Sequence, residues 1–159
     1  MLVLGIDTSC DDTAAALVED GVTIRSNVIA SQTGFHRKYG GIVPEIASRK
    51  HLESVNYVVA EALEVGNAAL SDLDAFAVTC GPGLEGALLV GVTTAKALAA
   101  GTGKALVGVN HVEGHVLSAF LGLPTPTLPF LCLVASGGHS DLVRVDAPTV
   151  LTLVGSTRD

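Results

Sequence analysis

The chain has 159 residues, a net charge of −7 and a mean hydropathy of +0.52. This length suits one domain or a little more, the apolar composition suits a globular core, and the negative charge argues against nonspecific nucleic-acid binding by the chain as a whole. No apolar run approaches the roughly 20 residues of a membrane span, Asp7 interrupts the apolar N-terminus, and the odd number of widely spaced cysteines fits neither disulfides nor a zinc knuckle. We therefore expect a cytoplasmic protein without membrane association.

Three β-prone runs open the chain, and Asp20-Gly21 is the expected hairpin turn between the second and the third. We expect these strands at residues 2–7, 13–19 and 22–29. A polar, glycine-containing loop follows over 32–43. Pro44 suits the first position of a helix, and we expect this helix to continue to residue 65. Its predicted buried side consists of apolar residues at helical spacing: Ile46, Leu52, Val55, Val58, Val59 and Leu63.

The next segments alternate between strands and helices until a proline-rich break at 123–126. Strands are expected at 74–79 and 105–109, around a helix of small residues at 85–100, and a further helix begins near His111. The resulting order, β-β-β-α-β-α-β-α, is that of a ribonuclease H-like domain, the unit from which actin-like ATPases are built.

After the break the pattern of strand, polar turn and strand restarts. Its strands are expected at 130–135, 141–145 and 149–155. We therefore expect an α/β, actin-like ATPase (ASKHA) fold with one complete lobe and the first strands of a second. The predicted domains are residues 1–127 and 128–159. Because no helices follow to cover the second sheet, we expect its apolar face to be open to water and most of the second lobe to be missing.

His111 and His115 lie four residues apart, so a helix places them on one face, where two imidazoles can bind one metal ion. Asn110 occupies the N-cap position, and a helix N-terminus favours the neutral imidazole that a metal requires. Glu113 falls at the N3 position, which a capping-box glutamate explains more simply than a catalytic base. A third ligand must come from elsewhere, and a coincidental pair of histidines is the alternative.

Two polar turns between strands offer phosphate-binding groups. Residues 7–13, which include Ser9, Cys10 and Asp11, combine hydroxyls, backbone N–H groups and carboxylates able to orient Mg²⁺ or water. Ser136-Gly137-Gly138 offers unobstructed backbone N–H donors, and His139 can add another. Such paired turns predict nucleotide binding, although each alone is compatible with an ordinary turn. Cys10 is not expected to act as a nucleophile, because no base is placed to activate it.

A local basic patch occurs on this acidic chain, formed by Arg37, Lys38, Arg49 and Lys50 together with His36 and His51. It predicts a contact with RNA or with a protein partner near the start of the helix at Pro44. A solvated helix face and loop is the alternative explanation.

Five segments occur together along the chain. They are Asp7-Thr8-Ser9-Cys10-Asp11-Asp12-Thr13, Tyr39-Gly40-Gly41-Ile42-Val43-Pro44-Glu45-Ile46-Ala47-Ser48-Arg49, Gly81-Pro82-Gly83, Asn110-His111-Val112-Glu113-Gly114-His115 and Ser136-Gly137-Gly138-His139. In order and spacing they resemble the TsaD family, formerly labelled O-sialoglycoprotein endopeptidase (Gcp), whose eukaryotic and archaeal members belong to the KEOPS complex. The resemblance covers essentially all 159 residues and is to the bacterial branch.

The resemblance implies a tRNA threonylcarbamoyltransferase, which moves the threonylcarbamoyl group from threonylcarbamoyl-AMP to N6 of the adenosine beside the anticodon. It implies one iron or zinc ion held by His111, His115 and an aspartate beyond residue 159. It implies binding of threonylcarbamoyl-AMP, or of ATP or ADP with or without Mg²⁺, by Val134, Ala135, Ser136, Gly137 and Gly138. The implied partners are tRNA, a TsaB-like actin-fold paralogue, a TsaE-like ATPase and, upstream, threonylcarbamoyl-AMP synthase.

Two other functions remain as alternatives. A non-catalytic actin-like module would bind nucleotide and partners without the third metal ligand. A metalloendopeptidase, as the older family label suggests, would need Glu113 as its base. Because the chain lacks one expected ligand and half of the expected nucleotide cleft, we expect it to be catalytically inactive on its own.

Overall fold

The computed structural model describes residues 1–122, 124–135 and 138–158. The chain divides into two compact units, Met1–His111 and Val112–Asp159. The predicted domain boundary between residues 127 and 128 falls inside the second unit and stays a prediction. None of the helices in the described part of the chain combines the length and the apolar character that a membrane span needs.

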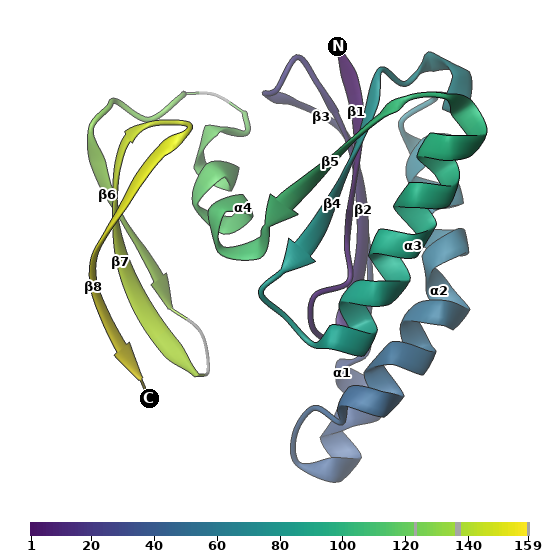
Figure 1. Cartoon of the computed structure of the whole chain (residues 1–159), viewed down its shortest axis with the longest axis horizontal. Coiled ribbons are helices and arrows are strands. Elements are labelled where there is room, and N and C mark those ends of the chain that lie inside the picture. Colours follow the sequence, from purple (N-terminus) through teal and green to yellow (C-terminus); the bar gives the residue numbers. More distant parts are fainter. Residues whose placement is uncertain (123, 136–137, 159) are drawn as a thin grey trace. The chain divides into compact units, whose positions relative to one another are not determined.

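The first unit is built on a five-stranded sheet in the order β3-β2-β1-β4-β5 (Figure 1). Its strands are β1 (Leu2–Asp7), β2 (Asp12–Glu19), β3 (Thr23–Ser31), β4 (Ala75–Gly81) and β5 (Ala105–Asn110). The first three strands pair antiparallel, and β1, β4 and β5 pair parallel. The parallel strands therefore end at one edge of the sheet, and this mixed order is the predicted ribonuclease H-like arrangement.

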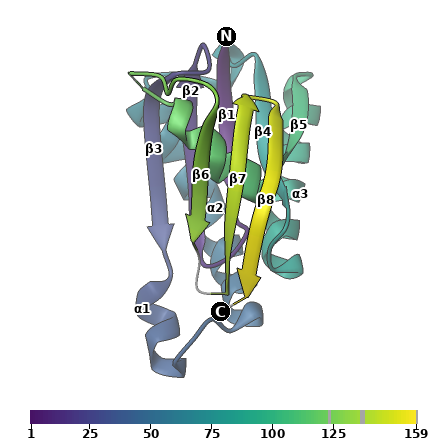
Figure 2. The same cartoon turned by 90° about the vertical axis from the view of Figure 1, so that its left-hand side faces the viewer.

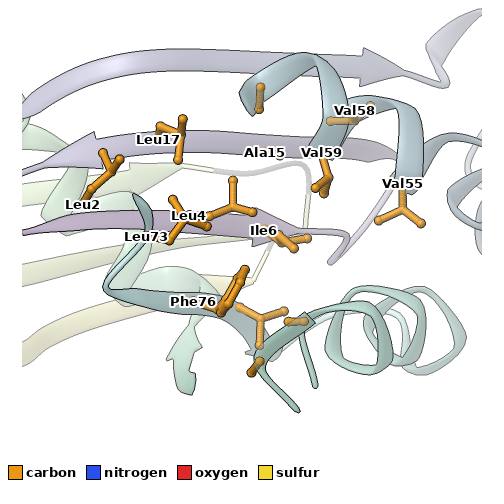
Figure 3. Close-up of a cluster of buried hydrophobic side chains, with 14 of the residues drawn as sticks. Leu2, Leu4, Ile6, Ala15, Leu17, Val55, Val58, Val59, Leu73 and Phe76 are labelled. Atoms are coloured by element: carbon orange, nitrogen blue, oxygen red, sulfur yellow. The ribbon is translucent and has the colours of Figure 1, made fainter. Parts of the chain in front are cut away.

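Two helices, α2 (Pro44–Val65) and α3 (Glu85–Thr102), lie side by side on one face of this sheet (Figure 1). The core between sheet and helices contains Leu4, Leu17 and Phe76, which are fully buried, and Figure 3 shows β1 side chains gathered with those of α2. Burying each such side chain stabilises the fold by about 1.5–3 kcal/mol. This packing fixes the ends of β1 and β4, where the candidate site begins.

Several local predictions are confirmed. The helix α2 has the predicted bounds, with Pro44 at its start. Asp20 and Gly21 both have positive φ, 53° and 76°, as a tight hairpin turn requires. The strands agree with their predicted ranges to within three residues.

Two predictions about residues 32–65 are wrong. Leu52 is not on the buried side of α2, because 64% of its surface is exposed; the buried stripe contains His51 in its place. Residues 32–43 are not only loop, because they contain the short helix α1 (Thr33–His36) and a 3-10 turn at Arg37–Tyr39. His36 is buried in this segment, and its hydrogen bonds with Gln32 and Val43 order the turn.

The second unit contains an antiparallel sheet formed by β6 (Phe130–Ala135), β7 (His139–Ala147) and β8 (Val150–Arg158), seen side by side in Figure 2. The helix α4 (His111–Leu117) begins at the end of the first unit and contributes Val116 to the core of the second, where the rings of Phe120 and Phe130 lie 5.8 Å apart. On the opposite side of β6, Leu131 and Leu133 are exposed, as expected for a sheet with one uncovered apolar face.

Candidate functional site

The connection between β1 and β2 is held from three directions. The carbonyls of residues 9, 10 and 11 each accept a hydrogen bond from a different part of the first unit. The donors are the backbone N–H of Leu84 to Ser9 (2.8 Å), Nε2 of His51 to Cys10 (3.1 Å) and the backbone N–H of Gln32 to Asp11 (3.1 Å). In a trans peptide the N–H points away from the preceding C=O, so the N–H groups of residues 10–12 are directed away from these three anchors. Such a run of N–H groups is what an anion-binding turn requires.

Thr8 fastens the same connection to α3. Its side chain is fully buried, and its Oγ1 donates to the carbonyl of Ala87 (2.7 Å) while accepting from the N–H of Gly91 (3.1 Å). A side chain at position 91 would collide with this hydroxyl, since a Cβ there would lie 2.5 Å from Thr8 Oγ1. The glycine is therefore required by the close approach of α3 to the turn.

Asp7, at the end of β1, collects several donors on one carboxylate. Thr79 Oγ1 donates to Oδ2 (2.6 Å) and the N–H of Ser9 donates to Oδ1 (2.7 Å). Burial acts to raise the pKa of Asp7, but the hydrogen bonds from Thr79, Ser9 and His111 outweigh it and hold the pKa below its ordinary value of 3.8. Asp7 is therefore a carboxylate near neutral pH and accepts, rather than donates, in this network.

His111 is oriented by the turn. Its Nδ1 lies 3.0 Å from Oδ2 of Asp7 and 3.1 Å from Oγ of Ser9. Because an ionised carboxylate can only accept, Nδ1 carries the proton, and in the neutral ring the lone pair is on Nε2. A carboxylate behind one nitrogen of an imidazole is the usual support of a histidine that binds metal through the other nitrogen.

His115 lies one turn later on α4, so the predicted helical placement of the pair is confirmed. Its carbonyl accepts a hydrogen bond from Ser118 Oγ (2.7 Å), which closes the end of this short helix. Within the described residues, no group of three His, Cys, Asp or Glu side chains is arranged to hold a metal ion. The metal-binding role of the pair stays a prediction.

The thiol of Cys10 is not activated as a nucleophile. Burial and the neighbouring carboxylates of Asp11 and Asp12 raise its pKa above the ordinary value of 9.0. The thiolate is therefore disfavoured, and the structure supports the expectation that Cys10 is not a nucleophile. Ser9, Cys10 and Asp11 do lie together in the anchored turn, and Ser9 reaches the metal-ligand candidate His111.

The second predicted turn is only partly described. Ser136 and Gly137 lie outside the described residues, as does the side chain of His139. Val134 and Ala135 form the end of β6, and Gly138 directly precedes β7. The β6–β7 hairpin is thus present at the predicted place, while the phosphate-binding role of its turn stays a prediction.

The basic patch is smaller than predicted, because His36 and His51 are buried and do not contribute to it. Arg37 and Lys38 are exposed in the 3-10 turn, and Arg49 and Lys50 lie on the first turns of α2. Arg49 forms an ion pair with Glu45 (2.8 Å), and Lys50 forms one with Glu53 (2.6 Å).

Sequence reasoning missed the buried polar residues Gln32, His36 and His51, which support the turn or the segment beside it. The one available signal was position: His51 falls on the same helical stripe as Val55, Val58 and Val59, where a polar residue calls for a buried partner.

The family model described as "TsaD: tRNA N6-adenosine threonylcarbamoyltransferase" matches residues 23–159. Relatives with this printed name include proteins from Syntrophobacter fumaroxidans, 54% identical over 100% of this chain and 47% of that protein, and from Moorella thermoacetica, 55% identical over 99% and 46%. The chain thus spans about half the length of the curated relatives it matches.

Solved structures show the fold. YeaZ from Pseudomonas aeruginosa matches with a TM-score of 0.63 and 16% identity, covering 99% of this chain and 68% of that chain. A ROK hexokinase from Thermus thermophilus matches with a TM-score of 0.55 and 16% identity, covering 97% and 48%. Both have the actin-like ATPase fold, which confirms the predicted fold class. Since the family model matches most of its length, the chain belongs to the TsaD family of tRNA N6-adenosine threonylcarbamoyltransferases.

Proposed function

We propose that this chain supplies the first phosphate-binding turn and two metal ligands of an enzyme that transfers a threonylcarbamoyl group from threonylcarbamoyl-AMP to N6 of the adenosine beside the tRNA anticodon. The observation that carries this proposal is the joint contact of Asp7 and Ser9 with Nδ1 of His111. It brings an anion-binding turn and a candidate metal ligand together at the carboxyl ends of β1 and β5, as an acyl-adenylate transferase would require.

The turn is suited to the phosphate of an adenylate. With the carbonyls of residues 9–11 bound to the protein body, the N–H groups of residues 10–12 are directed outward and can bind an anion without a buried cation. The proposed ligand is threonylcarbamoyl-AMP, or ATP or ADP with or without Mg²⁺. The second phosphate turn, at Ser136-Gly137-Gly138, is proposed on the resemblance alone.

The histidines fit an iron or zinc ion. Neutral imidazole nitrogen suits both metals, and Asp7 behind His111 is the kind of supporting carboxylate that such ligands have. We propose His111 and His115 as two of the ligands, with the third outside the described residues. When bound, the ion supplies Lewis-acid polarisation of an oxygen atom.

The transfer itself needs no covalent enzyme intermediate. The N6 amine attacks the carbamoyl carbon of the mixed anhydride, the bond to the adenylate phosphate breaks, and AMP leaves with the electron pair while the amine loses one proton. An anion-binding turn stabilises the charge that develops on the leaving phosphate. The raised pKa of Cys10 favours this direct attack over a route through an S-carbamoyl cysteine.

The proposed partners are tRNA, a TsaB-like protein, a TsaE-like ATPase and the synthase of threonylcarbamoyl-AMP. The likeness to YeaZ, a protein of the TsaB type, supports a shared fold between this chain and the paralogue. On α2 the side chains of Leu52, Tyr57 and Val65 are exposed, by 64%, 77% and 60%. Tyr57 and Val65 lie together on one side of α2 and suit contact with a protein. The exposed Arg37 and Lys38, which precede α2, suit contact with tRNA.

The test uses the complete natural protein with unmodified tRNA, threonylcarbamoyl-AMP and the partner proteins, and detects the modified nucleoside by mass spectrometry. We expect modification by the wild type and its loss in the double variant His111→Ala, His115→Ala. Glu113→Gln, on the same helix, is the matched control and should keep the activity. Modification by the double variant would make the histidine pair structural, and loss in Glu113→Gln would instead point to Glu113 as a base.

A non-catalytic binding module is the second candidate, because the anchored turn could bind an anion without a complete metal site. If the wild-type protein modifies no tRNA beside an active TsaD enzyme but still captures its partner, this candidate replaces the transferase.

A further inference from the structure

We propose that His51 is a positioning residue of the transfer reaction, which holds the Cys10 carbonyl from inside α2 and so directs the Asp11 N–H towards the adenylate phosphate. The inference rests on the proposed function for the identity of the ligand. The anchor itself is a property of the first unit and can be measured without any ligand.

His51 is fully buried, while its neighbour Leu52 is 64% exposed. A buried imidazole is unfavourable unless both of its nitrogens have hydrogen-bond partners. Nε2 lies 3.1 Å from the carbonyl oxygen of Cys10, and Nδ1 lies 2.8 Å from Oγ1 of Thr13. The ring therefore joins the middle of the phosphate turn to the first residues of β2.

The partners determine the protonation of the ring. A carbonyl oxygen only accepts, so Nε2 carries the proton and donates to Cys10. In the neutral ring Nδ1 then accepts the single proton of the Thr13 hydroxyl. Ser54 Oγ, 2.8 Å from Thr13 Oγ1, then shares its own proton between Thr13 and the carbonyl of Lys50 (2.8 Å). Burial lowers the pKa of His51, which favours this neutral form although the carboxylates of Asp7, Asp11 and Asp12 oppose it.

Among the three anchored carbonyls, that of Cys10 is the one held by a side chain. Backbone N–H groups hold the other two, at Ser9 and Asp11. The Asp11 N–H belongs to the same peptide as the Cys10 carbonyl and points in the opposite direction, where it also donates to the sulfur of Cys10. Releasing this carbonyl lets that peptide rotate, which would present an oxygen to an anion in place of a donor. A single side chain on α2 therefore controls the polarity of the turn.

The two nitrogens can be separated by substitution. In His51→Gln the side-chain amide reaches as far as Nε2 and keeps a donor for Cys10. In His51→Asn the shorter amide places its oxygen near the position of Nδ1, keeping an acceptor for Thr13, and leaves Cys10 unanchored. Ser54→Ala removes the hydroxyl that lies 2.8 Å from Thr13 Oγ1, outside the turn, and serves as the matched control for a change in packing beside the ring.

The experiment measures binding of AMP to the complete protein by calorimetry and the amide spectrum of the turn by ¹⁵N NMR, with thermal unfolding to show that each variant is folded. We expect His51→Gln and Ser54→Ala to bind within about threefold of the wild type, and His51→Asn to bind about tenfold or more weakly, as loss of one donor to the anion implies. The Asp11 amide resonance should shift in His51→Asn and stay near its wild-type position in His51→Gln.

Equal affinities and unchanged Asp11 resonances in both His51 variants would overturn the proposal and make His51 a core residue only. Equal loss in His51→Gln and His51→Asn would also overturn it, since a donor at Nε2 would then not matter. A wild-type protein that binds no adenylate overturns the proposed function and with it the role in transfer, whereas the Asp11 resonances still decide whether His51 anchors the turn.

Discussion

The carboxylate of Asp7 and the imidazole of His111 lie 3.0 Å apart (Oδ2 to Nδ1), although 104 residues separate them along the chain. Asp7 ends β1, and His111 directly follows β5. Because β1, β4 and β5 run parallel, their carboxyl ends meet at one edge of the sheet, and Thr79 on β4, between them, donates to the same carboxylate. The topology therefore builds the support for His111 out of three strands.

The variant Asp7→Asn tests this support. An amide can donate to Nδ1, which moves the ring proton to Nε2 and blocks the nitrogen proposed to bind metal. We expect the Kd for Zn²⁺, measured by calorimetry on the complete protein, to rise by about 10- to 100-fold. Thr79→Val is the control, because it removes one donor to Asp7 and leaves the Asp7–His111 contact in place; its effect on zinc affinity should be smaller. An unchanged zinc affinity in Asp7→Asn would show that the contact does not prepare His111 for a metal.

The burial of His51 predicts how stability depends on pH. Its pKa in the folded protein lies below the ordinary value of 6.5, so the unfolded chain takes up a proton at a higher pH than the folded one. The contribution of His51 to the free energy of unfolding is therefore complete above pH 6.5 and is lost as the pH falls from there towards the folded pKa. Urea unfolding measures the free energy of unfolding of the wild type and of His51→Gln. As the pH falls from about 7 to about 5, this free energy should decrease more for the wild type than for the variant. A difference that is constant with pH would mean that His51 is protonated as readily in the folded protein as in the unfolded chain.

Much of the local structure could be predicted, because the deciding interactions are close in sequence. Pro44 and the helical spacing of Val55, Val58 and Val59 are sufficient to define α2. The hairpin at Asp20-Gly21 follows from the tolerance of these residues for positive φ. The helical placement of the histidine pair was predicted in the same way.

The support of the site could not be predicted, because it depends on partners distant in sequence. From residue type alone, His51 is predicted to lie on the surface and the neighbouring Leu52 in the core. The assignment is reversed by Thr13, 38 residues away, whose hydroxyl gives the buried ring a partner. Similarly, no local pattern shows that the Cys10 carbonyl and the Nε2 of His51 meet, since the contact exists only once α2 has packed on the sheet.

Two glycines of α3 should respond to alanine in opposite directions. A Cβ at Gly91 would lie 2.5 Å from Thr8 Oγ1, whereas a Cβ at Gly101 would have no atom within 4 Å. We expect Gly91→Ala to lower the free energy of unfolding by about 1–3 kcal/mol, because Thr8 must move and its hydrogen bonds to α3 weaken. Gly101→Ala should raise it by up to about 1 kcal/mol, because alanine favours the helix. Urea unfolding of both variants checks the prediction; a stabilising Gly91→Ala would show that the turn gives way without cost.

The basic patch should contribute unequally to tRNA binding. Within the described residues no ion pair involves Arg37 or Lys38, whereas Arg49 and Lys50 are paired with Glu45 and Glu53. A paired cation must give up its partner before it neutralises a phosphate, so it adds less to the affinity. We expect the double variant Arg37→Gln, Lys38→Gln to weaken tRNA binding and to reduce the slope of log K against log[salt] by about 1–2, as loss of two phosphate contacts implies. The double variant Arg49→Gln, Lys50→Gln should change the slope less.

Filter binding between about 50 and 200 mM salt provides the measurement. Equal slopes for the wild type and both double variants would leave this patch as a solvated surface and place the tRNA contact elsewhere in the protein.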